Sequence, residues 1–257
     1  MRQLNKTSTS SRKTNMALTA YHQTLERFGL EKMKHGLDLQ VTKGGDIAVT
    51  RDGDLQFGNT QQNALFRLVE RWRGSESTIS ELFGPMLRAA QKLDELSGAR
   101  ARDQGPSLSR EPQAYHEVTD AIVEAQLVSS TLAGSIAVIV HSLLVRFKLD
   151  LNASKADWHA SPPQTAGFSL GEVFTAAAAN FRHYDEWAAA KKALTDQQLE
   201  SMTVLCGVLG LPVLNQHGHP SIRDNVCGAV TMKVTGGSAD ALHDMIFAYA
   251  KALARFS

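Results

Sequence analysis

The longest apolar stretch of the chain is LVSSTLAGSIAVIVHSLLV at residues 127–145, and its one ionisable side chain is His141. Its length matches the roughly 20 residues that a membrane-spanning helix needs. On a helix, however, Thr131, Ser135 and Ser142 fall near one stripe, and helical periodicity continues upstream into charged turns. This pattern is typical of a buried central helix. We therefore expect a helical core and no stable membrane insertion, with contact between this stretch and a membrane as the alternative.

Capping boxes indicate where further helices begin in the second half of the chain. In such a box a Ser or Thr is followed three residues later by Glu or Gln, and each side chain bonds to the other residue's backbone N–H. Ser169 with Glu172 and Thr195 with Gln198 both fit this pattern. Apolar periodicity and terminal glycines then predict helices over about 112–148, 169–194, 195–209 and 238–257. Residues 226–235 are compatible with a short strand or a helix.

The N-terminal half shows a different period. Between Leu37 and Phe57 apolar residues alternate, and Gly44-Gly45 and Asp52-Gly53 supply hairpin turns. This pattern predicts a three-stranded β-meander. From residue 59 the period becomes helical until Gly74, and the Thr78 to Glu81 box then predicts a new helix that Gly84-Pro85 disturbs.

A polar segment containing Gly105-Pro106 separates the two halves and is the best candidate for a linker. We therefore predict a flexible tail over 1–16, a module of meander and helices over 17–98, a linker over 99–111 and an all-helical domain over 112–257. The predicted fold class is mainly α (α+β overall), with an N-terminal three-stranded β-meander followed by a helical bundle.

The composition excludes several classes of protein. Of the 257 residues, 43% are hydrophobic and 21% are charged, which is typical of a globular protein. The net charge of +1 creates no global field that would attract nucleic acid or an anionic membrane. Two cysteines outside any C-x-x-C pair make a reducing cytoplasm the expected location. P-loop, Rossmann, nucleophile-elbow and zincin motifs are lacking from the sequence.

We expect no cofactor and no metal. Cys206, Cys227, His217 and His219 could supply four zinc ligands, but their spacing does not match common structural zinc sites. The segment His217-Gly218-His219-Pro220 is instead typical of a turn.

The most unusual polar cluster lies in AAAANFRHYDEW, residues 176–187. Asn180 falls in the apolar stripe of the predicted helix, where an unpaired amide would cost about 1 to 3 kcal/mol, so it must be hydrogen-bonded. His183 follows at the edge of the stripe, and Glu186 is close enough to orient its imidazole. Arg182 lies on the polar side. In the alternative interpretation, Asn180 caps a neighbouring helix and the charged residues form an ordinary solvated face.

The segment NFRHYDEW, which contains Asn180, Arg182 and His183, resembles a stretch found in proteins of the HEPN superfamily, and the resemblance extends over residues 169–194. These are small all-helical domains, many of which are metal-independent ribonucleases or toxins. The family signature has an Arg followed four to six residues later by a His, whereas Arg182 and His183 are adjacent. Arg110 and His116 have the family spacing, but Pro112 interrupts it.

The resemblance implies attack of a ribose 2′-hydroxyl on the neighbouring phosphate. His183 would act as general base or acid, Arg182 would stabilise the charge on phosphorus, and Asn180 would belong to the same polar cluster. Because Arg182 projects roughly 100° away from His183 on a helix, one helix cannot easily direct both at one phosphate. A symmetric homodimer could supply the missing arginine.

We therefore expect a cytoplasmic, toxin-like or phage-defence effector that acts on RNA as a homodimer, with a possible protein partner or antitoxin. The alternative is a non-enzymatic accessory subunit of a larger assembly, whose helices bind a partner. Exposure of His183 separates the two hypotheses, because a catalytic imidazole must reach solvent.

Overall fold

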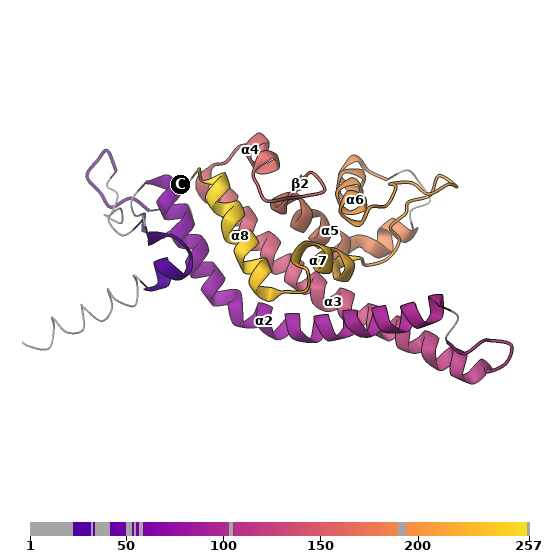
Figure 1. The fold of residues 1–257 in the computed structure, drawn as a ribbon. Coiled ribbons are helices and arrows are strands. Elements are labelled where there is room, and N and C mark those ends of the chain that lie inside the picture. Colours follow the sequence, from indigo (N-terminus) through magenta and orange to yellow (C-terminus); the bar gives the residue numbers. More distant parts are fainter. Residues whose placement is uncertain are drawn as a thin grey trace, which may run out of the picture. The chain divides into compact units, whose positions relative to one another are not determined.

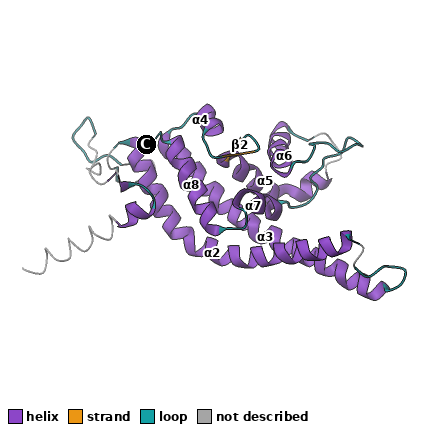
Figure 2. Ribbon diagram, viewed as in Figure 1, coloured by secondary structure: helices purple, strands orange, loops and turns teal. Residues whose placement is uncertain are grey.

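The computed structural model describes residues 23–31, 33, 42–49, 53, 55–56, 59–102, 105–189 and 194–255 (Figure 1). The chain forms two compact units, Met1–Val69 and Glu70–Ser257, which we describe separately. In the described residues the structure is mainly helical, with one short two-stranded sheet (Figure 2). The predicted helical bundle therefore fits the structure.

The predicted three-stranded N-terminal meander is wrong. Between residues 42 and 56 the described residues form a turn with one isolated antiparallel bridge, between Val49 and Leu55. Gln56 N also donates to Ala48 O at 3.0 Å. The predicted first strand, 37–41, lies outside the described residues. Val49 and Leu55 are 55% and 45% exposed, so no buried face supports a longer ladder. The turn predicted at Gly44-Gly45 is present, with Thr42 N donating to Asp46 O at 2.7 Å, but the described residues on either side of it form no sheet.

Helix α2, Thr60–Ala101, is continuous across both predicted interruptions. Gly74 does not end it, no second helix begins at Thr78, and Pro85 lies within it. The reason is a buried stripe that continues past Gly74 at helical spacing and consists of Trp72, Ile79, Phe83, Met86 and Ala90. Burial of this stripe outweighs the roughly 1 kcal/mol that a mid-helix glycine costs relative to alanine.

The second unit is built around helix α3, Pro112–Leu151, whose central residues are buried. It packs against α5 (Leu170–Ala189), α7 (Cys227–Thr235) and α8 (Ala239–Leu253). Residues 226–235, which the sequence left open, therefore form mainly a helix. Among the described residues α3 is the one helix with the length and composition to cross a membrane, and half of its most apolar window is buried. A core helix shares these properties, so the absence of membrane insertion stays a prediction.

Gly134 allows α3 and α5 to approach closely. A Cβ at this position would lie 2.1 Å from Cδ2 of Phe181 on α5. The phenyl ring therefore occupies the space that any larger residue would need. This contact fixes α5 just before Arg182 and His183.

The helices around α5 begin and end at local signals. Helix α6, Asp196–Leu209, starts at the complete capping box of Thr195 and Gln198 and ends at Gly210, which adopts a left-handed conformation. The short helix α4, Lys155–Ala160, is capped by Ser154. Strands β1 (Gln164–Thr165) and β2 (Phe168–Ser169) form a hairpin that leads into α5.

Candidate functional site

Helix α5 carries the candidate residues, and the capping box predicted at its start is confirmed. Ser169 N donates to Glu172 Oε2 at 2.8 Å, and Glu172 N donates to Ser169 Oγ at 3.2 Å. Val173, Phe174 and Ala177 then face the core. These contacts fix the rotation of α5 and hence determine which of its later residues face inward.

Asn180 faces the core and is fully buried, with 0% of its surface exposed. Its Nδ2 donates to Asp224 O at 3.2 Å, and its Oδ1 accepts from Val226 N at 2.9 Å. The amide is therefore hydrogen-bonded, as the sequence predicts, and its partners are backbone groups just before α7. Cys227 Sγ adds a bond to Ala177 O at 3.2 Å from the same segment. This side of α5 anchors α7.

His183 lies on the other side of the helix, and its side chain is 48% exposed. Its Nδ1 is 3.1 Å from Glu186 Oε1, so the sequence spacing predicted this pair correctly. Because a carboxylate only accepts hydrogen bonds, Nδ1 carries the hydrogen, and in a neutral imidazole Nε2 then has the lone pair. The imidazole is therefore both oriented and accessible, as a general base requires.

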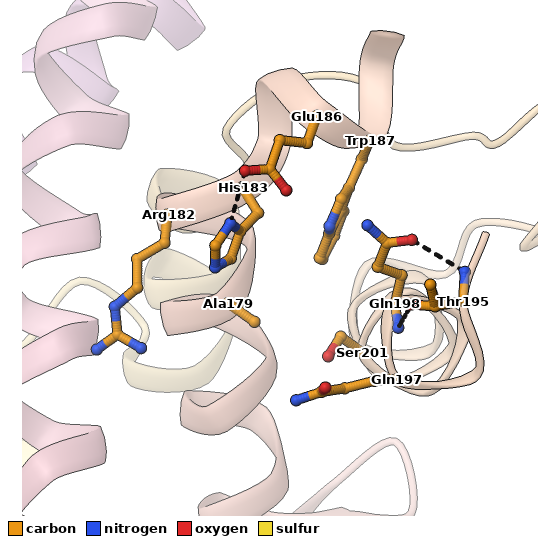
Figure 3. A pocket seen from close by; sticks show the side chains of 9 residues that line it. All are labelled: Ala179, Arg182, His183, Glu186, Trp187, Thr195, Gln197, Gln198 and Ser201. Atoms are coloured by element: carbon orange, nitrogen blue, oxygen red, sulfur yellow. Dashed lines mark hydrogen bonds and ion pairs between the residues drawn. The ribbon is translucent and has the colours of Figure 1, made fainter. Parts of the chain in front are cut away.

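A cavity of about 250 Å³ lies beside this pair, between α5 and α6 (Figure 3). Helix α6 supplies Gln197 and Ser201, and the Thr195 and Gln198 side chains at its start are already engaged in their capping box. Trp187 forms an apolar wall. The complete lining is Ala179, Arg182, His183, Glu186, Trp187, Thr195, Gln197, Gln198 and Ser201. The cavity is thus mainly polar and suits a polar substrate.

Arg182 lines the same cavity, but Figure 3 shows its guanidinium directed away from α6. Its charge acts instead on His141 of α3: burial, and next the positive charge of Arg182, lower the pKa of that imidazole. His141 Nδ1 lies 3.2 Å from Thr175 Oγ1. The structure therefore joins His183 to Glu186, whereas Arg182 and Asn180 point in other directions.

Sequence analysis missed a second His–Glu pair next to this cavity. His159 Nδ1 lies 2.5 Å from Glu172 Oε1. The pair lines a further cavity of about 210 Å³, which shares Ala179, Gln197 and Ser201 with the first. His159 belongs to α4, in a segment for which the sequence analysis predicted no helix. The Ser154 cap of α4 was the available signal, but the pairing itself depends on how two elements pack.

The four sequence candidates for zinc do not form a cluster. In the part of the chain that the structure describes, no three His, Cys, Asp or Glu side chains lie close enough to hold an ion. Cys206 and Cys227 are buried, and burial raises the pKa of the Cys227 thiol to about 12. His217 and His219 are in the predicted turn, where both backbone N–H groups donate to Asn215 Oδ1.

Comparison of the chain with known proteins identified no relative. No protein-family model matches the chain, and no curated protein or solved structure matches it. The HEPN-like resemblance of residues 169–194 therefore stays a prediction, and function is argued from the site.

Proposed function

We propose that the protein is a toxin-like, metal-independent endoribonuclease of HEPN-like type, with its active site in the cavity beside His183. The observation that carries this proposal is the accessible His183 imidazole held by Glu186 at 3.1 Å at the edge of a polar cavity. Of the three residues that the sequence singled out, His183 alone has the accessibility and orientation for proton transfer.

In the proposed reaction Nε2 of His183 accepts the proton of a ribose 2′-hydroxyl. The 2′ oxygen attacks the neighbouring phosphorus, the bond from phosphorus to the 5′ oxygen breaks, and water protonates that oxygen. The products are a 2′,3′-cyclic phosphate and a 5′-hydroxyl end. The negative charge of Glu186 stabilises the imidazolium that forms. A positioned acid–base group of this kind contributes typically about 10² to 10⁴ in rate.

Arg182 supplies positive charge to phosphorus only if it comes from another copy of the chain. Within one chain it extends away from α6 (Figure 3), and its charge lowers the pKa of His141. A homodimer across this face would bring Arg182 of the partner subunit to the His183 cavity, where it would stabilise the charge that develops on phosphorus. We therefore include homodimerisation in the proposal.

Asn180 has a positioning role in this proposal. Its bonds to Asp224 O and Val226 N hold α7 against α5, and through this contact they fix the helix that carries His183. It does not touch substrate, because it is fully buried.

A second candidate function is a non-enzymatic accessory subunit that binds a partner protein. It is favoured by apolar side chains on the surface of α3, where Val123 is 57% and Leu127 is 61% exposed, with Val128 beside them. Val123 and Leu127 lie one helical turn apart, and a group of exposed apolar side chains of this kind is typical of interaction surfaces. In this case His183 would be a surface residue without catalytic function.

Cleavage of total RNA by the purified protein distinguishes the ribonuclease from the accessory subunit. Wild type should cleave in the presence of a chelator, and His183→Gln should lose at least about a hundredfold in rate. His219→Gln, which changes an exposed histidine in the turn, is the matched control and should cleave normally. Equal cleavage by His183→Gln and wild type would overturn the catalytic assignment. If neither cleaves and Leu127→Ser disrupts binding of a co-purifying protein, the accessory subunit is the better interpretation.

A further inference from the structure

The second cavity, of about 210 Å³, lies between α4, α5 and α6 and contains a more firmly held imidazole than the first. Trp158, Ala176 and Val204 form an apolar wall. Opposite charges line the rest: Lys148, Lys155, Glu172 and Glu200, with His159 among them. No part of the proposed ribonuclease reaction uses these residues.

Four contacts fix His159 and its neighbours. Glu172 Oε1 accepts from His159 Nδ1 at 2.5 Å, while Glu172 Oε2 accepts from Ser169 N at 2.8 Å. The carbonyl of His159 accepts from Gln164 Nε2 at 3.2 Å, and the preceding carbonyl of Trp158 accepts from Tyr249 Oη at 2.8 Å. Both carboxylate oxygens of Glu172 are thus occupied, and Nε2 of His159 has no partner among the described residues.

Lys148 has a positive charge that no described carboxylate neutralises. Its Nζ lies over the Trp158 ring, 5.0 Å from the ring centre, and this cation–π contact leaves the ammonium N–H groups able to donate to an anion. Lys155 differs, because its Nζ is 3.5 Å from Glu200 Oε1. The cavity therefore offers one free cation and one imidazole to a ligand.

The groups that face His159 determine how protonation changes the cavity. The charged residues that line the cavity with His159 are Lys148 from α3, Lys155 from α4, Glu172 from α5 and Glu200 from α6. Asp157 lies two residues before His159 on α4. Asp157 is already bound to Arg255 at 3.0 Å. The remaining two lysines and two glutamates balance, so protonated His159 gives the cavity a net positive charge. Protonated His159 therefore favours an anion in this cavity.

We propose that this cavity binds the phosphoryl group of a small phosphate monoester, between Lys148 Nζ and the Nε2–H of protonated His159. Both groups donate hydrogen bonds, and both carry the charge that a phosphate needs. The volume is below the 300 to 1,000 Å³ of sites for drug-sized ligands. It fits a phosphoryl group with a sugar-sized body against the wall of Ala176 and Val204.

This site adjoins the one proposed for RNA cleavage and shares Ala179, Gln197 and Ser201 with it, but its imidazole is held elsewhere. Glu172 and Glu186 anchor the two imidazoles and are fourteen residues apart on α5, which is about 21 Å along the axis at 1.5 Å per residue. One phosphate cannot contact both imidazoles. The phosphate monoester is either a free sugar phosphate or the terminal phosphate of an RNA, and the latter rests on the proposed function.

Titration calorimetry of the full chain with ribose 5-phosphate tests the proposal, with ribose as the unphosphorylated control. We expect ribose 5-phosphate to bind and ribose not to bind. His159→Gln and Lys148→Met should each weaken binding about tenfold or more, which is the effect of losing a charge-assisted bond. Lys233→Met on the exposed face of α7 is the matched control and should bind normally.

Circular dichroism and thermal unfolding of each variant separate loss of a contact from loss of the fold. Equal binding of ribose and ribose 5-phosphate, or equal weakening by Lys233→Met and Lys148→Met, would overturn the proposal. So would normal binding by a folded Lys148→Met.

Binding of short oligoribonucleotides with and without a 5′ or 3′ phosphate shows whether the bound phosphate belongs to an RNA end or to a free sugar phosphate. A preference for a phosphorylated end that Lys148→Met removes assigns the cavity to RNA ends, and a preference for ribose 5-phosphate alone assigns it to a free sugar phosphate. The proposed ribonuclease can fail independently: phosphate binding without any RNA cleavage would overturn that function and leave this site. RNA cleavage that needs His183, in a protein that does not bind the phosphate, would support the ribonuclease function and overturn the phosphate site.

Discussion

Asn180 and His183 lie three residues apart on α5 and have opposite environments. Asn180 is fully buried and bonded to two backbone groups, whereas His183 is about half exposed and bonded to one carboxylate. The difference arises because Asn180 continues the stripe of Val173 and Ala177, and His183 lies at its edge. The two residues should therefore respond differently to substitution, one in stability and the other in activity.

Replacing Asn180 by alanine should destabilise the protein without a specific loss of chemistry. The substitution leaves Val226 N and Asp224 O without their side-chain partners, and an unsatisfied buried group costs about 1 to 3 kcal/mol. We expect the free energy of unfolding, measured with urea, to fall by about 2 to 4 kcal/mol. Gln197 is an exposed residue of α6, and Gln197→Ala is the control. This substitution should change the free energy of unfolding by less than about 0.5 kcal/mol. An Asn180→Ala protein as stable as wild type would contradict the positioning role.

His141 should make the stability of the protein depend on pH. Burial, followed by the charge of Arg182, lowers the pKa of this imidazole in the folded state. The unfolded chain then binds a proton at higher pH than the folded chain does, so stability falls as the pH drops below about 6.5. Urea unfolding at several values between about pH 8 and pH 5 should show this decrease.

His141→Gln is the test variant, because it cannot be protonated and its amide can still reach Thr175 Oγ1. It should show a smaller decrease in stability over the same pH range. A decrease as steep as that of wild type would assign the pH dependence to other groups.

At the scale of elements, local signals predicted helix ends well where side chains bond to the backbone of the same helix. The capping boxes predicted at Ser169 and Thr195 are both present, and Ser238 caps α8 where the sequence predicted a helix to begin. Such bonds involve residues three apart, so the sequence contains all the information needed. The ends that were predicted wrongly, at Gly74 and Thr78, depend on which residues are buried by other elements.

The same distinction explains the candidate site. The pairing of His183 with Glu186 could be predicted because both lie on one helix face. The pairing of His159 with Glu172 could not, since it joins α4 to α5 across the hairpin of β1 and β2. The three-stranded meander was wrong for a related reason: turn residues specify a reversal of the chain, but a sheet needs a buried face against which to pack.

Gly134 should be essential to the packing of α3 against α5. In Gly134→Ala the new Cβ would lie 2.1 Å from the Phe181 ring, so the ring or the helix must shift. Overpacking of this kind typically costs about 1 to 3 kcal/mol. We expect a lower melting temperature and reduced RNA cleavage, because a shift of Phe181 displaces the turn of α5 that also carries His183.

Gly74→Ala provides the matched control for this substitution. A Cβ at Gly74 meets no atom within 4 Å, and the residue lies inside continuous α2. Alanine there should stabilise the protein by up to about 1 kcal/mol. A loss of stability at Gly74 would contradict the continuity of α2, and an unchanged melting temperature for Gly134→Ala would contradict the close packing of α3 and α5.

At the scale of the whole molecule, the small net charge of +1 means that substrate recognition depends on local groups. Within one chain the described residues near His183 provide Arg182 as a cation, and its guanidinium is directed away from α6. A single copy therefore has an oriented acid–base residue without a cation aimed at the same phosphate. The proposed homodimer supplies the missing charge through symmetry.

Mixing two inactive variants tests this arrangement. If each active site combines His183 of one copy with Arg182 of the other, His183→Gln and Arg182→Ala should each be inactive as homodimers. After exchange of subunits in an equimolar mixture, about half of the dimers contain one of each variant, since random pairing of symmetric dimers is statistical. Each such dimer has one intact site of two, so the mixture should recover about a quarter of wild-type activity. Activity that stays at the level of the single variants, in a mixture shown by native mass spectrometry to contain the mixed dimer, would place both residues in one chain and exclude the shared site.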